Sequence, residues 1–424
     1  MKENLKFYGH DTVALAKRYG TPLYVFSANC FHASVEAIRR AFQKTKLDVT
    51  IHYAGKAFLT KAMCKLVAQE GLHLDVASGG ELFTALQAGF PAEDICFHGS
   101  NKSNEELQMA LDHRIGLIVI DSFDEIDRLT NLTTPEDRVD ILVRIAPGIE
   151  AHTHELIQTG KVDSKFGVPA SMVPQLMETL QELPRFQLKG LHCHIGSQIT
   201  ETEGFIKAAE KMLEIYAWIQ KNYGQSFDYL NLGGGFGIPY LPQDPCIDLN
   251  ALFTDLGEKV RDLCTEYDLK IPQLMFEPGR YLAATAGVTL YTVGTIKEIP
   301  GQKTYVSVDG GMMDNPRPAL YGAAYHAEIC NGKDEDKPVT VRISGKACET
   351  DTLIDQILLN DPQVGDILMV HATGAYNYAM ASNYNRLPKP AVVLLMDDQS
   401  DIISRRETYE DIVRLDEIPS WLED

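Results

Sequence analysis

The sequence predicts an α/β fold in which a (β/α)₈ barrel of the TIM type is joined to a mainly antiparallel β domain. Up to about residue 281, short apolar runs alternate with helical patterns. Most of these runs are almost continuously apolar, as expected for strands buried on both faces of a parallel sheet. From residue 282 onward, strands follow one another without amphipathic helices between them, which indicates an antiparallel domain of the β-barrel or sandwich kind.

Eight apolar runs predict the strands of the barrel. They are DVTIHYA (48–54), LHLDVAS (72–78), DICFHGS (94–100), GLIVIDS (116–122), DILVRIAP (140–147), LKGLHCHIG (188–196), DYLNLGG (228–234) and QLMFEPG (273–279). Eight strands that alternate with helices predict a closed barrel. A doubly wound open sheet is the alternative, because a sequence does not reveal the order of its strands.

The starts and stops of several helices are also predicted. In a capping box, an N-cap hydroxyl and a glutamate three residues later cap each other's backbone N–H groups. Four candidate boxes are Ser78–Glu81, Ser103–Glu106, Ser122–Glu125 and Thr200–Glu203. Gly89, followed by Phe90-Pro91, predicts the end of a helix.

The β domain is predicted from turn-separated strands near the C-terminus. They are GVTLYTVGTIKEIP (287–300), KTYVSVDGG (303–311), KPVTVRISG (337–345), GDILMVHAT (365–373) and AVVLLMDD (391–398). An earlier strand, TPLYVFS (21–27), is expected to join them. We therefore expect a barrel domain at 28–281 and a β domain made of 1–27 and 282–424.

Composition restricts the classes of partner and compartment. The net charge of −20 argues against nucleic acid or an anionic membrane as a partner, because phosphate binding needs a cationic surface. The sequence contains no run of about 18 apolar residues, so no membrane-spanning helix is predicted. The eight cysteines are scattered without a C-x-x-C pair, and the N-terminal stretch is polar. These features predict reduced thiols in a cytoplasmic protein.

Polar and glycine residues gather where the predicted barrel strands end. They are Lys56, Asp75, Arg144, His192, His194, Gly233–Gly237 and Glu277–Arg280. Each has an ordinary structural explanation when taken alone. Because the active sites of (β/α)₈ enzymes lie at the carboxyl ends of the strands, together they predict one polar site.

One chemistry that this rim could support is metal-assisted hydrolysis. His192 and His194 lie on the same face of a strand, since side chains alternate with period two, and His152 and His154 could add ligands. This interpretation leaves the glycine run and the segment 277–280 without a role.

The other chemistry is that of pyridoxal phosphate, which uses all of these features. It needs a lysine for the Schiff base, backbone N–H groups for the phosphate and a group that faces the ring nitrogen. Lys56 can be the lysine, Gly233–Gly237 can bind the phosphate, and Glu277 can pair with the ring nitrogen. One of the histidines can stack on the ring.

A set of motifs runs through nearly the whole chain. They are YAGKAF (53–58), LDVASGGEL (74–82), HTHELIQTGKVDSKFG (152–167), HCHIGSQI (192–199), LNLGGGFGIPY (230–240), EPGRYL (277–282), VDGGMMDNPRPALYGAAYH (308–326), KACETD (346–351) and GAYNYAMASNYN (374–385). In these motifs and their order, the sequence resembles the diaminopimelate decarboxylases, within the alanine-racemase-like class of pyridoxal phosphate enzymes. The segments DSKFG, HIGSQ and EPGR together are highly specific.

The resemblance implies a role for each matching residue. Lys56 would form the Schiff base, His194 would stack on the ring, and Glu277 would face the ring nitrogen. The full set expected to bind the cofactor is Lys56, His194, Ser197, Gly234, Gly235, Glu277, Pro278, Gly279, Arg280 and Tyr376. Cys348, supplied by the partner subunit of a homodimer, would donate the proton after CO₂ leaves.

The distal end of diaminopimelate carries both an amine and a carboxylate. Arg280 and Arg317 could bind the carboxylate, Glu349 could receive the ammonium, and Tyr321 could add a hydrogen bond. Tyr376 is expected to touch the substrate as well as the cofactor. The arginines together with Glu349 favour diaminopimelate over ornithine, arginine or alanine.

We therefore expect decarboxylation of meso-2,6-diaminopimelate to L-lysine and CO₂, the last step of lysine biosynthesis, with Lys56 and Cys348 as catalytic residues. The alternatives are a decarboxylase of another basic amino acid and a non-catalytic pyridoxal phosphate protein. One departure concerns the segment after the cysteine. Family members commonly have ESGD there, whereas this chain has Glu349-Thr350-Asp351-Thr352, which predicts a differently shaped loop.

Overall fold

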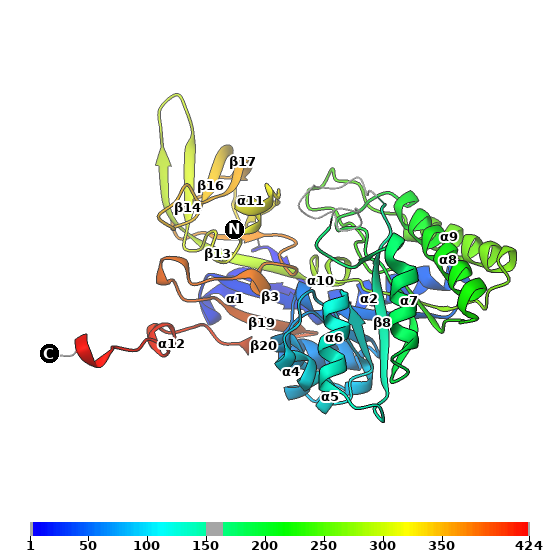
Figure 1. The fold of residues 1–424 in the computed structure, drawn as a ribbon. Helices are drawn as coiled ribbons and strands as arrows, with labels where there is room; N and C mark the ends of the chain where they lie inside the picture. Colours follow the sequence, from blue (N-terminus) through cyan, green and yellow to red (C-terminus); the bar gives the residue numbers. More distant parts are fainter. Residues whose placement is uncertain (1–2, 150–163, 423–424) are drawn as a thin grey trace. The chain divides into compact units, whose positions relative to one another are not determined.

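The computed structural model describes residues 3–149 and 164–422, and the chain divides into two compact units (Figure 1). The first, here called the barrel unit, comprises the described residues within His32–Pro239 and Gln243–Leu282. The second, the β unit, comprises the described residues up to Phe31, Tyr240–Pro242 and the described residues from Ala283 onward.

The barrel unit contains a closed sheet of parallel strands, which confirms the predicted (β/α)₈ barrel. Its strands are β4 (Val49–Ala54), β5 (His73–Val76), β6 (Ile95–Phe97), β7 (Leu117–Ile120), β8 (Val139–Ala146), β10 (Phe186–His192), β11 (Tyr229–Asn231) and β12 (Gln273–Phe276). The sheet closes because β10 pairs with β8 as well as with β11. This pairing excludes the open-sheet alternative. A two-residue strand, β9 (Val168–Pro169), extends the edge of β8.

Helices follow the barrel strands in the order that the sequence predicts. They are α3 (Lys61–Gln69), α4 (Gly79–Gln87), α5 (Asn104–Asp112), α6 (Phe123–Leu132), α7 (Val173–Gln181), α8 (Glu203–Tyr223) and α9 (Leu249–Glu266). In α8, Phe205, Met212, Tyr216 and Ile219 are buried. Their spacing of three, four or seven residues places them on one helix face, which packs on the barrel unit's core while the opposite face stays polar.

The helix signals were only partly correct. Ser103 and Glu106 form a complete capping box at the start of α5. Ser78 and Ser122 cap α4 and α6 through their hydroxyls, but the glutamates are used elsewhere: Glu81 accepts from the N–H of Ala77, and Glu125 from Lys102.

At α8 the predicted box is absent, because the helix begins after Thr202 without a side-chain cap. The stop at Gly89 is confirmed, since α4 ends at Gln87 and Gly89 has a φ of 66°.

The β unit is built on a second sheet with the strand order β17-β16-β14-β13-β3-β19-β20, with β18 pairing with β13 and β15. Its strands are β3 (Leu23–Ser27), β13 (Gly287–Glu298), β14 (Thr304–Val308), β15 (Ala327–Ile329), β16 (Pro338–Ser344), β17 (Thr352–Asn360), β18 (Ile367–Val370), β19 (Ala391–Met396) and β20 (Gln399–Ser404). Most pairs are antiparallel, and β14–β16 and β19–β3 are parallel. As predicted, the early strand β3 belongs to this sheet; β15, β17 and β20 were not predicted.

Short elements complete the β unit. They are β1 (Lys6–Phe7), β2 (His10–Asp11), α1 (Thr12–Tyr19), α11 (Arg317–Tyr321) and α12 (Tyr409–Val413). Helix α2 (Ala28–Phe42) follows β3, and the four-residue α10 (Arg280–Ala283) follows β12.

The sheet of the β unit is buried on both faces, as β13 illustrates. Val288 and Leu290 belong to one apolar cluster, whereas Tyr291 and Val293 belong to another. Because side chains of a strand alternate between its faces, these clusters cover opposite sides of the sheet.

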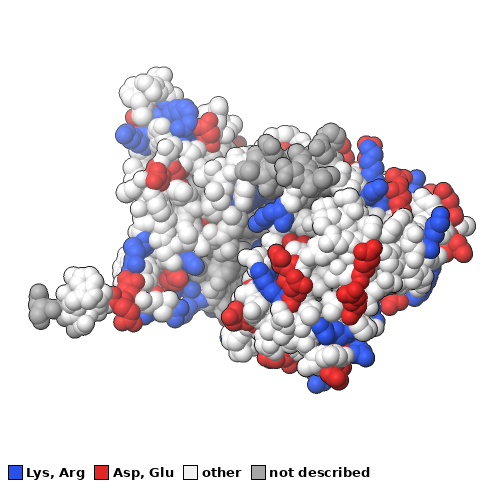
Figure 2. All heavy atoms as spheres, in the orientation of Figure 1, with Lys and Arg blue, Asp and Glu red and all other residues white. Residues whose placement is uncertain are grey.

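Acidic and basic side chains are interspersed on the face of the molecule drawn in Figure 2. A search of the described helices for one that is long and apolar enough to cross a membrane found none.

Candidate active site

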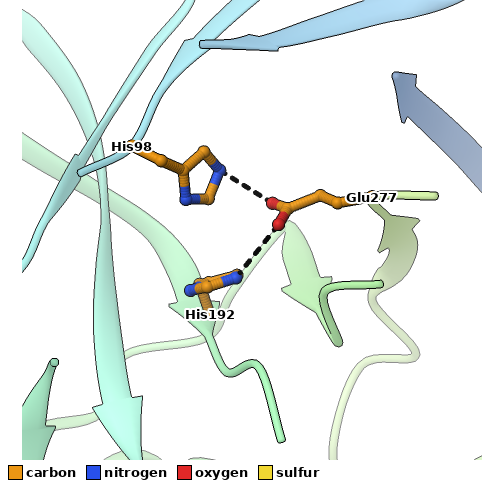
Figure 3. Close-up of side chains that lie close together, drawn as sticks. All are labelled: His98, His192 and Glu277. Carbon is orange, nitrogen blue, oxygen red and sulfur yellow. Dashed lines mark ion pairs between the residues drawn. The ribbon is translucent and has the colours of Figure 1, made fainter. Parts of the chain in front are cut away.

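Glu277 is the centre of a buried polar network where the barrel strands end (Figure 3). Its Oε1 lies 2.7 Å from His98 Nε2, and its Oε2 lies 3.2 Å from His192 Nε2. Asn231 donates through Nδ2 to Oε1 at 2.6 Å. Residues from β10, β11 and the segments after β6 and β12 therefore surround one carboxylate.

The network holds a fixed pattern of charge. Burial opposes ionisation of Glu277, but His98 and His192 hold its pKa well below the ordinary value. Burial likewise opposes protonation of His98, but Asp75 and Glu277 raise its pKa well above the ordinary value. Burial lowers the pKa of His192 to about 4, so this ring is neutral near pH 7. A carboxylate thus faces one charged and one neutral imidazole.

The glycine loop after β11 packs tightly against this network. A Cβ on Gly234 would lie 2.0 Å from the carbonyl oxygen of Glu277, and one on Gly235 would lie 2.3 Å from that of Gly196. Gly235 also has a φ of 107°, which side chains disfavour. Only glycine fits at these two positions, because a side chain would collide with the neighbouring backbone.

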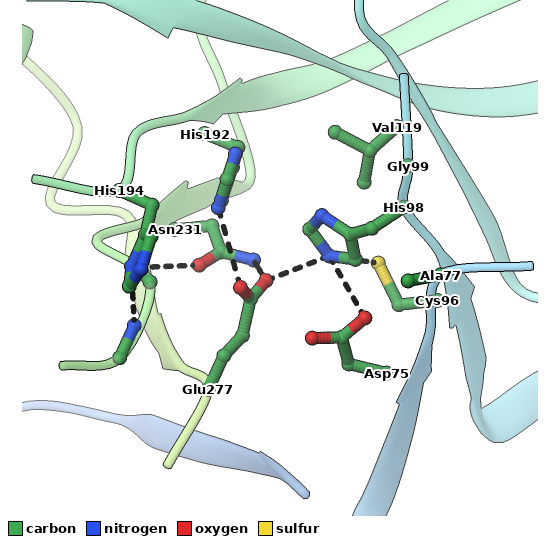
Figure 4. A network of polar contacts seen from close by, with 12 residues as sticks. Asp75, Ala77, Cys96, His98, Gly99, Val119, His192, His194, Asn231 and Glu277 are labelled. Atoms are coloured by element: carbon green, nitrogen blue, oxygen red, sulfur yellow. Dashed lines mark hydrogen bonds and ion pairs between the residues drawn. The ribbon is translucent and has the colours of Figure 1, made fainter. Parts of the chain in front are cut away.

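His194 follows β10 and lies beside the same loop (Figure 4). The N–H of Gly234 donates to its Nδ1 at 3.3 Å, so Nδ1 is an acceptor and the ring is neutral. Burial and the nearby Lys56 ammonium lower the pKa of His194 well below its ordinary value, in agreement with this assignment. His194 therefore presents a flat, uncharged ring.

Lys56 lies in the single turn Gly55–Ala57 immediately after β4, and it is exposed. Its positive charge acts on the groups around Glu277: it favours the ionised form of Asp75 and the neutral form of His194. Lys56, after β4, and His194, after β10, are therefore close enough for the lysine charge to affect the histidine ring.

The segment Glu277–Arg280 is fixed at both of its ends. Arg280 is buried and donates to Ser197 Oγ from Nη2 at 2.9 Å and from Nε at 3.3 Å. A Cβ on Gly279 would lie 3.0 Å from the Cβ atoms of Ala54 and Ala57. Gly279, next to the buried Pro278, therefore allows this segment to pack directly against the turn that carries Lys56.

In the β unit, Arg317 begins α11 as a buried cation. It donates through Nη1 to Tyr325 Oη at 2.6 Å and to Tyr240 Oη at 3.0 Å. Its guanidinium carbon lies 5.1 Å from the centre of the Tyr240 ring. Among the hydrogen bonds of the described residues, Arg317 uses only Nη1, which leaves Nε and Nη2 to bind an anion.

Cys348 and Glu349 are exposed in the loop between β16 and β17. The N–H of Cys348 donates to Asn385 Oδ1 at 2.9 Å, and Glu349 Oε1 accepts from Tyr384 Oη at 2.6 Å. Asp351 stabilises the loop, since its carboxylate accepts from the N–H groups of Met312 at 2.7 Å and Ala347 at 2.9 Å.

The segment that departs from the common ESGD pattern therefore contributes a structural carboxylate. Asp351 has a φ of 39°, in a region that aspartate tolerates better than most residues. Glu349 and Asp351 also line a cavity of about 730 Å³ within the β unit, together with Pro318 and Tyr325.

Two further expected site residues also lie in the β unit. Tyr321 ends α11 and is half-buried. Tyr376 follows β18, is half-buried, and has a φ of 62°. A tyrosine in this left-handed conformation is strained, which is a common property of residues at functional sites.

The metal-site interpretation is not supported for the predicted histidines. His192 forms a cluster of metal-ligand type with His98 and Glu277 among the described residues, but His194 is not part of it. Instead, His194 bonds the glycine loop. His152 and His154 lie outside the described residues.

Two members of the network were missed by the sequence analysis. His98 lies near the end of the predicted strand DICFHGS, and Asn231 lies within DYLNLGG. Both are polar residues at the carboxyl end of a barrel strand, which is the signal that selected Lys56 and Glu277. Arg144, which the sequence analysis placed on this rim, lies with its Nη1 3.9 Å from Asp121 Oδ1.

The residues at these strand ends fit pyridoxal phosphate. The carboxylate of Glu277 is kept ionised, and its two oxygens can accept one more donor, such as a ring N–H. A neutral imidazole and a closely packed glycine loop lie beside it, and an exposed lysine acts electrostatically on the same network. Lysine, phosphate-binding loop and nitrogen partner are the three groups that this cofactor requires of a protein.

Comparison with known proteins also indicates a pyridoxal phosphate enzyme. The family model for the pyridoxal binding domain of pyridoxal-dependent decarboxylases matches residues 32–284. The diaminopimelate decarboxylase of Bacillus subtilis (strain 168) is 48% identical over 417 residues, which cover 97% of this chain and 95% of that protein.

Solved structures are similar over almost the whole chain. Diaminopimelate decarboxylase from M. jannaschii, solved in co-complex with L-lysine, has a TM-score of 0.89 and 33% sequence identity, covering 100% of this chain and 98% of that one. The enzyme from Helicobacter pylori, also complexed with L-lysine, has a TM-score of 0.86 and 28% identity, with coverages of 95% and 98%.

Proposed function

Since the chain belongs to the diaminopimelate decarboxylases, we propose that it converts meso-2,6-diaminopimelate to L-lysine and CO₂ with pyridoxal phosphate as cofactor. This is the last step of lysine biosynthesis. The observation that carries the proposal is the buried, ionised carboxylate of Glu277 at the end of the barrel strands, with a charged imidazole beside it.

Bound pyridoxal phosphate supplies a conjugated ring that accepts the electron pair released when the bond from Cα to the carboxylate breaks. We assign covalent attachment of the cofactor to Lys56. Glu277 keeps the ring nitrogen protonated, because an ionised carboxylate stabilises a positive charge at short range. The neutral ring of His194 would stack on the cofactor ring without adding a competing charge, and Ser197, Gly234, Gly235 and the Glu277–Arg280 segment would hold the cofactor.

His98 and Asn231 are positioning residues in this scheme. They share Glu277 Oε1, and His192 lies on Oε2, so the carboxylate is held in one orientation. This arrangement removes the cost of reorienting the carboxylate during the reaction.

The distal end of the substrate is assigned to the β unit. Arg317 is desolvated and held by two tyrosine hydroxyls, and its free N–H groups suit a bidentate bond to a carboxylate. Glu349 supplies the anion for the distal ammonium, with Tyr384 orienting it. Arg280, Tyr321 and Tyr376 are assigned as further contacts to the substrate.

We assign the final proton transfer to Cys348, whose thiol gives its proton to Cα after CO₂ leaves. We propose a homodimer in which the partner subunit supplies this thiol. Mixing the Lys56→Ala and Cys348→Ala variants tests this assignment: activity should return in the mixture if two subunits share a site. An inactive mixture of exchanged subunits would refute sharing.

We also propose that the barrel domain at 28–281 binds the cofactor, and that 1–27 and 282–424 carry the substrate and interface residues. A cytoplasmic location is supported by the eight cysteines, all of which are free thiols.

The test of the function is CO₂ release by purified protein with added pyridoxal phosphate. Meso-diaminopimelate, ornithine, arginine and lysine are offered in parallel, and L-lysine is measured as the product. Release from diaminopimelate, with L-lysine formed in equal amount, is the expected result. Release from ornithine or arginine alone would overturn the substrate assignment, and no release from any would overturn the enzyme.

A further inference from the structure

The β unit contains a second cluster of metal-ligand side chains, which the proposed reaction does not use. His371 Nε2 lies 2.8 Å from Glu328 Oε1, and His326 Nε2 lies 3.8 Å from the same oxygen. The ligand atoms of the three residues all lie within 4.8 Å of one another. The two imidazole rings are stacked, with centroids 5.3 Å apart.

Glu328 lies in β15, and His326 and His371 lie one residue beyond the ends of β15 and β18. Ala327 pairs with Val370 in the antiparallel ladder, so His326 and His371 are the next pair along it. The N–H of His371 donates to the carbonyl oxygen of His326 at 3.0 Å. Glu328 is two residues from His326 and therefore points to the same face.

We propose that His326, Glu328 and His371 bind one divalent transition-metal ion of the Zn²⁺ class. Two imidazole nitrogens and one carboxylate oxygen are a common set of zinc ligands in proteins. With metal–ligand bonds of about 2.0–2.1 Å, tetrahedral ligands stand roughly 3.3 Å apart. The observed separations lie on both sides of this value, so small side-chain rotations complete the site.

The exposure of the cluster suits an ion that enters from solvent. The side chains of His326, Glu328 and His371 are 36%, 44% and 31% exposed. An ion bound there keeps an open position for water, since the chain supplies three ligands.

An ordinary surface ion pair looks different in this chain. His32 Nδ1 lies 2.9 Å from Glu70 Oε1, but Glu70 has only one imidazole and is completed by Arg39 at 3.7 Å. Among the described residues, the ion-pair partners of Glu328 are two histidines and no lysine or arginine. Without a fixed cation beside Glu328, its carboxylate and the two imidazoles are available as ligands for a metal ion.

The position of the cluster gives a bound ion a structural consequence, which rests on the proposed function. His326 directly follows Tyr325, the partner of Arg317, and His371 begins the loop that leads to Tyr376. An ion would tie together the ends of β15 and β18, next to Tyr325, which orients Arg317, and to the loop that carries Tyr376.

Direct metal binding tests the proposal without reference to activity. The holoenzyme is freed of metal by chelation and titrated with Co²⁺, whose visible absorption reports the ligand set, and then with Zn²⁺ in competition. We expect one ion per chain, no thiolate charge-transfer band from the exposed Cys246 or Cys348, and a higher unfolding temperature in Zn²⁺.

Three variants and one matched control complete the test. His326→Asn, His371→Asn and Glu328→Gln should each weaken Co²⁺ binding by about 10-fold or more, the range seen even for outer-shell partners of metal ligands. His32→Asn, which removes the imidazole of the ordinary pair, should bind Co²⁺ as the wild type does. Circular dichroism and cofactor absorbance confirm that each variant is folded.

The proposal is overturned if the wild type binds no stoichiometric ion at micromolar Co²⁺ or Zn²⁺. It is also overturned if both histidine variants bind as tightly as the wild type. Because the readout is metal binding, a failed metal test does not affect the proposed decarboxylase function. Conversely, a protein that binds one ion but shows no decarboxylase activity would support the metal site and refute the proposed function.

Discussion

His98 and Glu277 form a buried ion pair, with Nε2 and Oε1 separated by 2.7 Å and both side chains less than a tenth exposed. The two residues are far apart in the sequence and meet only because the barrel closes. Each moves the pKa of the other toward its charged form. The charge state of the proposed cofactor site therefore depends on this pair.

Glu277→Gln should abolish most of the activity while leaving the fold intact. Glutamine keeps the shape but cannot hold the ring nitrogen protonated, so we expect kcat to fall roughly 100-fold or more. Glu125→Gln is the matched control, because Glu125 pairs with Lys102 in the same unit but does not contact the site. Near-normal kcat in Glu277→Gln would contradict the assigned role.

His98→Asn should lower the free energy of unfolding by an amount that depends on pH, because it removes one charged partner of Glu277. The pKa of His98 is raised, so its contribution is complete below the ordinary value of 6.5 and is lost as pH rises through the raised value. The pKa of Glu277 is depressed, so its contribution is complete above the ordinary value of 4.5 and is lost only as pH falls through the depressed value.

The stabilisation by the pair is therefore complete between pH 4.5 and pH 6.5, and it is lost as the pH rises further through the raised pKa of His98. Within that window the variant should lose about 3 kcal/mol, the cost of leaving one buried charge without its partner. Thermal unfolding of both proteins across the pH range measures this difference, which should narrow under alkaline conditions. A difference that is constant with pH would show that His98 does not act as a cation.

Cys348→Ala should separate cofactor binding from product formation. The thiol does not hold the cofactor in our scheme, so cofactor absorbance should remain, while the rate of L-lysine formation falls roughly 100-fold or more. Cys246→Ala, at the other exposed cysteine, is the control and should be fully active. Normal turnover by Cys348→Ala would remove this residue from the mechanism.

Arg317→Met should act on substrate discrimination. The variant keeps an apolar stem but loses the donors for the distal carboxylate, so kcat/KM for meso-diaminopimelate should fall roughly 100-fold. Tyr325→Phe removes one hydroxyl that orients Arg317 and should cost about 10-fold. The surface variant Arg405→Met should match the wild type. An unchanged kcat/KM in Arg317→Met would place the distal carboxylate elsewhere.

The sequence predicts the positions of some site residues in the fold but not which of them face each other. The eight barrel strands are apolar runs with sharp ends, so the sequence places Lys56 and Glu277 at the carboxyl end of a strand. It cannot show which strand ends face each other across a closed barrel. His98 was therefore missed as the partner of Glu277.

Local signals were less reliable where a side chain had a better partner elsewhere. Glu125 fits a capping box, but a buried lysine, Lys102, lies 2.6 Å from its Oε1 and takes the carboxylate instead. Likewise, the sequence suggests Arg317 as a candidate partner for a carboxylate, but it does not reveal the two tyrosines that hold this arginine. Such partners come from tertiary packing, which overrides local pattern.

The most direct test of the central claim is to find which lysine carries the cofactor. The holoenzyme is treated with borohydride, which fixes the cofactor to its lysine, then digested and analysed by mass spectrometry. We predict that the modified peptide contains Lys56 and that Glu277→Gln leaves this site of attachment unchanged. Modification of a different lysine, or a holoenzyme with no modified lysine, would contradict the account.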